Sequence, residues 1–139
     1  MARRNGRILA FQALFAWETG RNDPALLDTF SWKDSRRRIA EEDLVFGRLL
    51  FHGALEHIDE VDEAIRAHLT NWDFNRLNRV DLAILRLSAY TLLYQRDLHP
   101  SIVIDEAVDI AKEFSQDDSY KFVNGVLDNI RKDLPGGGP

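Results

Sequence analysis

The chain has 139 residues, which is enough for one domain with a hydrophobic core. It contains no cysteine, so disulfides, zinc–thiolate sites and cysteine nucleophiles are excluded, and this composition suits a cytoplasmic protein. The net charge of −5 argues against bulk binding of nucleic acid, and no apolar run is long enough to span a membrane.

The first predicted helix runs from about Asn5 to Thr19 and should be central. Between Ile8 and Trp17 its only polar side chain is Gln12, and a helix that is apolar on nearly every side is buried on nearly every side. The start of this helix is basic, with no acidic residue before position 18 and with Arg3, Arg4 and Arg7. Guanidinium groups bind phosphate well, whereas the alternative is a solvated, frayed terminus. We expect Gly6 to loosen this segment.

A short second helix is predicted from Asp23-Pro24 to about Phe30, because Asp is a good N-cap and Pro a good first residue. Residues 31–35 form a loop. The helical pattern over 36–69 is too long for one uncapped helix, so we expect a break near 57–59. Residues 70–78 are then a connector.

A second central helix is predicted over 79–95. We expect one narrow polar strip to be the only side of this helix that faces outward. The strip consists of Asp81, Ser88, Thr91 and Gln95. Arg86 projects away from this strip, toward the side of the helix that we expect to be buried. An unpaired charge is costly in a buried position. An internal ion pair and a contact with a partner protein are both open for Arg86.

An amphipathic helix is predicted from Pro100, and a last helix from Asp117 or Asp118 to before Pro135. The inward positions of the first are Val103, Ala107, Ile110, Ala111 and Phe114, and the outward ones are Asp105, Asp109, Lys112 and Glu113. Residues 135–139 form a glycine-rich tail that we expect to be flexible.

The last helix carries an aromatic residue outside its apolar stripe. Phe122 lies roughly 90° from the stripe of Val123, Val126, Leu127 and Ile130. Gly125 beside it is a poor helix former that leaves bare backbone. We interpret Phe122, with Asp118, Gly125 and Asn129, as a docking surface; packing of Phe122 beneath a loop is the alternative.

A cluster of aromatic, basic and amide side chains occupies the connector. Such groups can stack on and hydrogen-bond to unpaired bases, and they are Trp72, Phe74, Asn75, Arg76, Asn78 and Arg79. For Trp72 we favour a structural role, in which it fills a gap between two sub-bundles. Arg76 and Arg79 are secondary candidates for RNA binding.

The pattern predicts an all-α protein of about seven helices, arranged as two small sub-bundles within one domain, 1–134. The N-terminal sub-bundle covers about 5–70 and the C-terminal one about 75–134. No catalytic, metal or cofactor site is predicted, because the four histidines lack the spacing that puts ligands on one helical face. Arg36, Arg37 and Arg38 are followed by acids, which favours ion pairing on a solvated face over phosphate binding.

Three segments resemble the NusB family of bacterial transcription antitermination factors. They are Arg7–Trp17 (RILAFQALFAW), Trp72–Tyr94 (WDFNRLNRVDLAILRLSAYTLLY) and Ile104–Asp128, whose string KFVNGVLD is the most specific part. The resemblance implies an all-α protein of two three-helix sub-bundles without enzymatic activity. It also implies pairing with ribosomal protein NusE, binding of boxA RNA from ribosomal RNA leaders, and action within the RNA polymerase antitermination complex.

The resemblance assigns roles to the candidate residues. Arg3, Arg4 and Arg7 would bind RNA, and the surface around Asp118 and Phe122 would contact NusE, with Arg86 as a further candidate. The sequence Arg3-Arg4-Asn5-Gly6-Arg7 is a thin basic run, so the isolated subunit is expected to bind RNA weakly. A protein-only helical adaptor without an RNA role is the alternative, a methyltransferase accessory domain is less favoured, and a homodimer is possible.

Overall fold

The computed structural model describes residues 3–20, 23–33 and 38–135, and within them the chain is helical with no strand. The elements are α1 (Arg4–Gly20), α2 (Pro24–Leu27), α3 (Glu41–Glu56), α4 (Ile58–Ala67), the 3-10 turn η1 (Phe74–Arg76), α5 (Arg79–Tyr94), α6 (Pro100–Phe114) and α7 (Ser119–Lys132). The prediction of an all-α protein with about seven helices is confirmed. No helix among these residues has the length and apolar character needed to cross a membrane.

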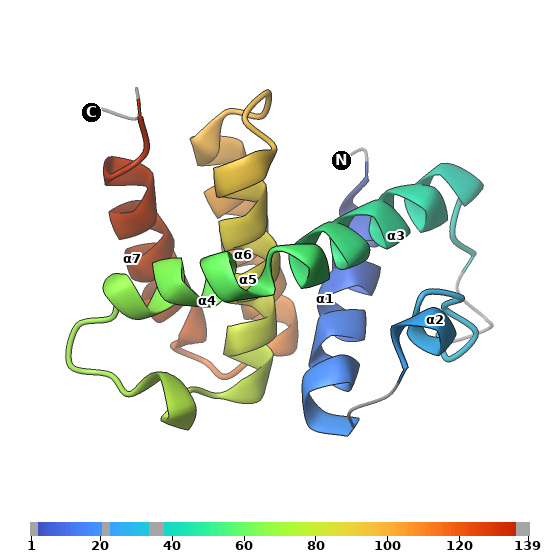
Figure 1. Cartoon of the computed structure of the whole chain (residues 1–139), viewed down its shortest axis with the longest axis horizontal. Helices are drawn as coiled ribbons and strands as arrows, with labels where there is room; N and C mark the ends of the chain where they lie inside the picture. Colours follow the sequence, from blue (N-terminus) through green and yellow to red (C-terminus); the bar gives the residue numbers. More distant parts are fainter. Residues whose placement is uncertain (1–2, 21–22, 34–37, 136–139) are drawn as a thin grey trace.

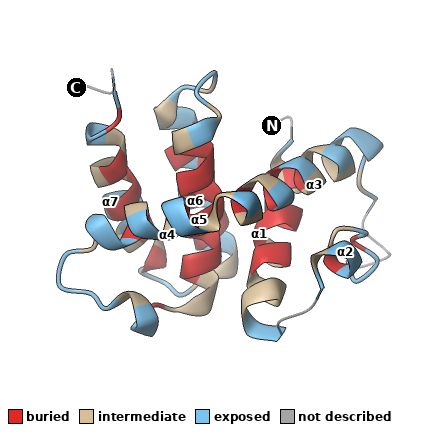
Figure 2. Ribbon diagram, in the orientation of Figure 1, coloured by how far each residue is buried: buried red, intermediate tan, exposed pale blue. Residues whose placement is uncertain are grey.

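Helix α5 stands at the centre of the molecule (Figure 1). It packs against α1, α3, α4, α6 and α7. Nearly all of its residues are buried, in contrast to the surface helices (Figure 2). Because α5 packs against helices of both halves, one hydrophobic core joins them. The division into two sub-bundles near residue 70 stays a prediction.

The expected outward strip on α5 is wrong. Asp81, Ser88 and Thr91 are all buried, because α6 and α7 cover this side of the helix. Two of these three polar groups have partners inside the protein: Thr91 donates to the carbonyl of Leu87 at 2.9 Å, and Asp81 accepts hydroxyl hydrogen bonds from Ser115 and Ser119 at the α6–α7 turn. Asp81 and Thr91 can therefore be buried, since each is hydrogen-bonded.

The break between α3 and α4 falls at His57, inside the predicted range. Helix α2 is shorter than predicted, because Asp28 ends it and Phe30 adopts a positive φ of 54°. The buried ring of Phe30 packs instead under α3. The inward and outward faces predicted for α6 are confirmed, and α7 begins after Asp118 as expected.

Gly6 does not loosen the N-terminal segment; it lies inside α1 and is buried. A Cβ atom there would lie 2.8 Å from the carbonyl oxygen of Asp43 and 2.9 Å from the ring of Phe46. Gly47 of α3 faces it, and a Cβ atom at Gly47 would lie 3.0 Å from the carbonyl oxygen of Gly6. The two glycines allow the backbones of α1 and α3 to approach closely, which gives Gly6 a packing role.

Candidate functional site

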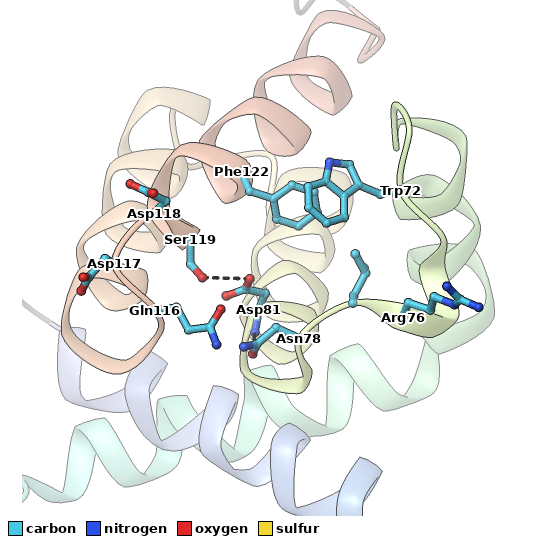
Figure 3. A pocket seen from close by; sticks show the side chains of 10 residues that line it. Trp72, Arg76, Asn78, Asp81, Gln116, Asp117, Asp118, Ser119 and Phe122 are labelled. Atoms are coloured by element: carbon cyan, nitrogen blue, oxygen red, sulfur yellow. Dashed lines mark hydrogen bonds between the residues drawn. The ribbon is translucent and has the colours of Figure 1, made fainter.

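A pair of aromatic side chains, one exposed and one half-buried, marks the surface between the α4–α5 connector and α7. The rings of Trp72 and Phe122 meet at a centroid separation of 5.1 Å and an angle of 58° (Figure 3). Trp72 is 60% exposed, so the prediction that it fills a gap between sub-bundles is wrong. Phe122 is half-buried and lies outside the apolar stripe of α7, as the periodicity predicted. Trp72 contacts the ring of Phe122 and is itself exposed, so the pair remains accessible to solvent through Trp72.

A hollow of about 680 Å³ opens beside this pair. The side chains around it are mostly polar, and the full lining is Trp72, Arg76, Leu77, Asn78, Asp81, Gln116, Asp117, Asp118, Ser119 and Phe122. The structure thus brings Arg76, predicted to bind RNA, together with Asp118 and Phe122, predicted to bind a protein partner. Aromatic rings, amides, a guanidinium and carboxylates share one concave surface, which can stack on and hydrogen-bond to a planar polar ligand.

A buried hydrogen-bond network holds the hollow in shape. Ser115 Oγ donates to Asp81 Oδ1 at 2.5 Å, and Ser119 Oγ donates to Asp81 Oδ2 at 3.0 Å (Figure 3 shows the latter bond). Asp81 lies in the first turn of α5, whereas the serines flank the turn between α6 and α7. The network therefore ties the start of α7, and with it Asp118 and Phe122, to the start of α5.

The sequence reasoning missed this network and the neighbouring Gln116 and Asp117. A polar run immediately before the last helix was the available signal for them. The sequence predicted Asn78 only as one member of the aromatic, basic and amide cluster of the connector. Its Oδ1 accepts from the backbone N–H groups of Val80 and Asp81, so it caps α5, and its amide NH2 remains as a donor toward the hollow.

A second, smaller hollow of about 170 Å³ lies on the Gly125 side of the aromatic pair. Its lining is His68, Thr70, Trp72, Lys121, Phe122, Gly125, Val126 and Asn129. A Cβ atom built at Gly125 would meet no other atom within 4 Å, which agrees with the bare-backbone notch expected there. Predicted partner residues thus line both hollows, with Phe122 common to them.

The N-terminal arginines contact the acidic face of α6. Arg4 lies 3.2 Å from Glu113, 3.7 Å from Asp109 and 3.8 Å from Glu106. Glu106 is a buried carboxylate whose Oε1 has no hydrogen-bond partner among the described residues, and Arg7 approaches that oxygen at 4.0 Å. Burial lowers the pKa of Arg7, although the charge of Glu106 opposes this. Glu106 occupies an inward position of α6, three residues after Val103, so the periodicity could have identified it.

The arginines at the start of α1 also lie over an aromatic ring. The guanidinium carbons of Arg3 and Arg7 are 4.9 Å and 5.4 Å from the ring centre of Phe46. Arg3 is exposed, Arg4 is partly exposed, and only 11% of the Arg7 side chain is accessible. Arg3 is therefore the most accessible of the three candidate phosphate ligands, whereas Arg4 would have to exchange its carboxylate partners to bind a phosphate.

The two secondary candidates differ in their surroundings. The side chain of Arg76 is 87% exposed and lines the larger hollow. Arg79 instead donates to the carbonyl of Asn75 at 2.7 Å and lies 3.8 Å from Glu18 of α1. Arg36 and Arg37 fall outside the described residues, as does the tail after Pro135.

Arg86 forms an internal ion pair, which was one of the two interpretations left open. Its guanidinium donates to both carboxylate oxygens of Asp62 at 2.9 Å and to Glu18 at 2.6 Å, and the residue is 5% exposed. Burial alone lowers the pKa of Arg86, but the hydrogen bonds and charges of Asp62 and Glu18 outweigh this effect and raise it. The group links α5 to α1 and α4, and we leave it out of the candidate partner surface.

No cluster of three or more potential metal ligands occurs in the part of the chain that the structure describes. The four histidines have separate surroundings. For example, His68 lies with Nδ1 2.7 Å from the carbonyl oxygen of Ala64 and Nε2 2.6 Å from Asp133, which links α4 to the end of α7.

Known proteins resemble this chain over nearly its whole length. The model of the NusB family matches residues 4–132. The transcription antitermination protein NusB of Treponema pallidum (strain Nichols) is 55% identical over 132 residues, which cover 95% of this chain and 94% of that protein. NusB of T. maritima superimposes with a TM-score of 0.85 at 35% identity, covering 98% and 95% of the two chains. A crystal structure of antitermination factors NusB and NusE in complex with dsRNA has a TM-score of 0.85 at 29% identity, covering 96% of this chain and 100% of the matched one. The chain belongs to the NusB family.

Proposed function

We propose that this protein is a subunit of a transcription antitermination complex, in which it binds boxA-type RNA of ribosomal RNA leaders together with ribosomal protein NusE. In this role it modulates termination by RNA polymerase in the cytoplasm and catalyses no reaction. The proposal is supported by family membership and by the similar NusB structure that contains both NusE and dsRNA.

The open aromatic pair carries the proposal. Trp72 and Phe122 present aromatic surface to solvent beside the larger hollow, where Arg76 and the amides of Asn78 and Gln116 also lie. Stacking of an unpaired base on an aromatic side chain is worth about 1–3 kcal/mol, and amides and guanidinium groups bind base edges and phosphates. We therefore assign an unpaired base of the RNA to this hollow.

The smaller hollow is assigned to NusE. Gly125 offers open backbone there, Asn129 offers an amide, and Phe122 lies at its edge. A partner docked on this side would contact Phe122 from the face opposite the base. Asp118 lines only the larger hollow of the two, so we place it near the junction of RNA and NusE. RNA and NusE would then meet on either side of one aromatic pair and bind cooperatively.

The N-terminal arginines are proposed to bind RNA phosphates. Arg3 is free of carboxylate partners among the described residues, whereas Arg4 and Arg7 share the carboxylates of α6. Because these acids compete with phosphate, we expect the isolated protein to bind RNA weakly. A partner that supplies further contacts would then be required for tight binding.

Titration of boxA RNA with the protein alone and with the protein plus NusE, at two salt concentrations, tests the proposal. We expect weak, strongly salt-dependent binding by the protein alone and at least tenfold tighter binding with NusE, a coupling of about 1.4 kcal/mol. The alternative, a protein-only adaptor, predicts NusE binding without any effect on RNA affinity. Equal RNA affinity with and without NusE would reject the cooperative site proposed above.

A further inference from the structure

A separate apolar groove lies between α4 and the end of α5, outside the two hollows described above. It has a volume of about 520 Å³ and is lined by Asp59, Glu60, Glu63, Ala64, Ala67, Leu93 and Tyr94. The α4 residues recur at helical spacing and form one face of that helix, while Val61 and Ile65 on its other face are buried in the core. Helix α4 crosses in front of α5 in Figure 1. The groove-lining face of α4 is therefore the one that does not pack into the core.

The floor of the groove is apolar and its aromatic residue is held in place. Ala64 and Ala67 have short side chains that leave room for a larger apolar group above them, beside Leu93. Tyr94 is 40% exposed, and His57 stacks on its ring at 4.0 Å with an angle of 20°. Tyr90 stacks on Tyr94 as well, at 5.6 Å. A ring ordered in advance loses little entropy when a ligand binds to it.

The rim of the groove is acidic, and most of its charge is unpaired. Asp59, Glu60 and Glu63 are all exposed. Glu60 lies 3.5 Å from His57, but no lysine or arginine within the described residues reaches ion-pair distance of Asp59 or Glu63. Such a rim repels RNA phosphates and attracts cationic side chains. Charge and shape together select a basic protein segment.

We infer that this groove binds a segment of a partner protein in which arginine or lysine residues flank one aliphatic side chain. The aliphatic side chain would occupy the space above Ala64 and Ala67. The flanking guanidinium groups would pair with Asp59 and Glu63 and contact the exposed part of the Tyr94 ring, a favourable cation–π interaction. This inference does not depend on the proposed RNA function, because it uses none of the residues of the two hollows.

A short capped peptide with arginines on both sides of a single leucine is the probe. Its binding to the isotope-labelled protein is followed by NMR, and its affinity by fluorescence polarisation at low and high salt. We expect the shift changes to cluster on residues 59–67 and 93–94, with affinity falling as salt rises. A matched peptide with glutamates in place of the arginines should not bind.

Two double variants separate this groove from acidic surface in general. Asp59→Asn with Glu63→Gln should weaken peptide binding about fivefold, the effect of losing exposed ion pairs. Glu41→Gln with Glu42→Gln neutralises exposed acids in the first turn of α3 and should leave the affinity unchanged. Tyr94→Leu, which keeps the apolar floor, should weaken binding of the peptide.

Three outcomes would overturn the inference. They are no binding of the arginine peptide, shift changes elsewhere on the surface, or equal losses of affinity in the two double variants. RNA affinity should be the same in all these variants, so a failure here is distinguishable from a failure of the proposed function.

Discussion

Trp72 and Phe122 come from a connector and from the last helix, yet their rings contact each other at 5.1 Å on the surface of the protein. Trp72 is 60% exposed, and Phe122, which packs partly against the core, lies outside the buried apolar stripe of α7. Large exposed aromatic surface of this kind marks binding sites. The contact also places both candidate hollows around one pair of residues.

The first prediction concerns stacking on Trp72. Trp72→Ala should weaken boxA RNA binding in the presence of NusE by about tenfold, since loss of one stacked base costs about 1–3 kcal/mol. Trp72→Phe keeps an aromatic face and should recover most of the affinity. Fluorescence titration measures both, with circular dichroism to check the fold. If Trp72→Phe binds as poorly as Trp72→Ala, stacking is not the interaction that Trp72 contributes.

A second prediction uses the salt dependence of RNA binding. Removing Arg3 and Arg4 together should reduce the slope of log affinity against log salt by about 1.4, because each phosphate contact to a single strand contributes about 0.7. Arg96→Ala, which removes an exposed arginine outside the proposed site, should leave the slope unchanged. An unaltered slope in the double variant would remove the N-terminal arginines from the RNA site.

The carboxylates of α6 give a third prediction, opposite in direction. Glu113 lies 3.2 Å from Arg4, so Glu113→Gln should release Arg4 and strengthen RNA binding about twofold to threefold. Asp105→Asn changes an exposed acid of the same helix that has no arginine partner among the described residues, and it serves as the matched control. Equal gains in both variants would indicate a general effect of net charge rather than competition for Arg4.

Arg86 gives a prediction about stability. Arg86→Leu should lower the free energy of unfolding by about 3–5 kcal/mol, because it leaves Asp62 and Glu18 without their shared cation in a largely buried setting. Arg79→Leu removes a more exposed contact to the same Glu18 and should cost less than about 1 kcal/mol. Urea denaturation of the two variants makes the comparison. Similar small losses in both would contradict a structural role for the Arg86 ion pairs.

The notch at Gly125 gives the fifth prediction. Gly125→Leu should leave the fold intact, since a Cβ atom there meets nothing within 4 Å, but it should weaken NusE binding about tenfold by filling the smaller hollow. Asn124→Leu changes an exposed neighbour on α7 that does not line that hollow. Calorimetric titration with NusE compares the variants. NusE affinity equal to that of the unaltered protein in Gly125→Leu would place the partner elsewhere.

The helices could be predicted because their apolar residues recur at helical spacing and their ends carry recognisable caps. The inward face of α6, the break at His57 and the start of α7 after Asp118 all follow from such local patterns. Phe122 could be identified as unusual for the same reason. Exposure of Trp72 could not, because a tryptophan in a connector packs inward or outward according to the path of the loop.

What the sequence by itself determined was the helical class, the central position of α5 and an aromatic residue outside the apolar stripe of its helix, because these depend on spacing within single elements. Which residues meet was decided by tertiary structure alone. Three contacts join elements that are far apart in the chain. Asp81 is buried beneath the α6–α7 turn, Arg4 pairs with carboxylates of α6, and α1 approaches α3 closely at Gly6. Periodicity reports which side of a helix is apolar, whereas the partner of a polar or charged group depends on the neighbouring helix that reaches it.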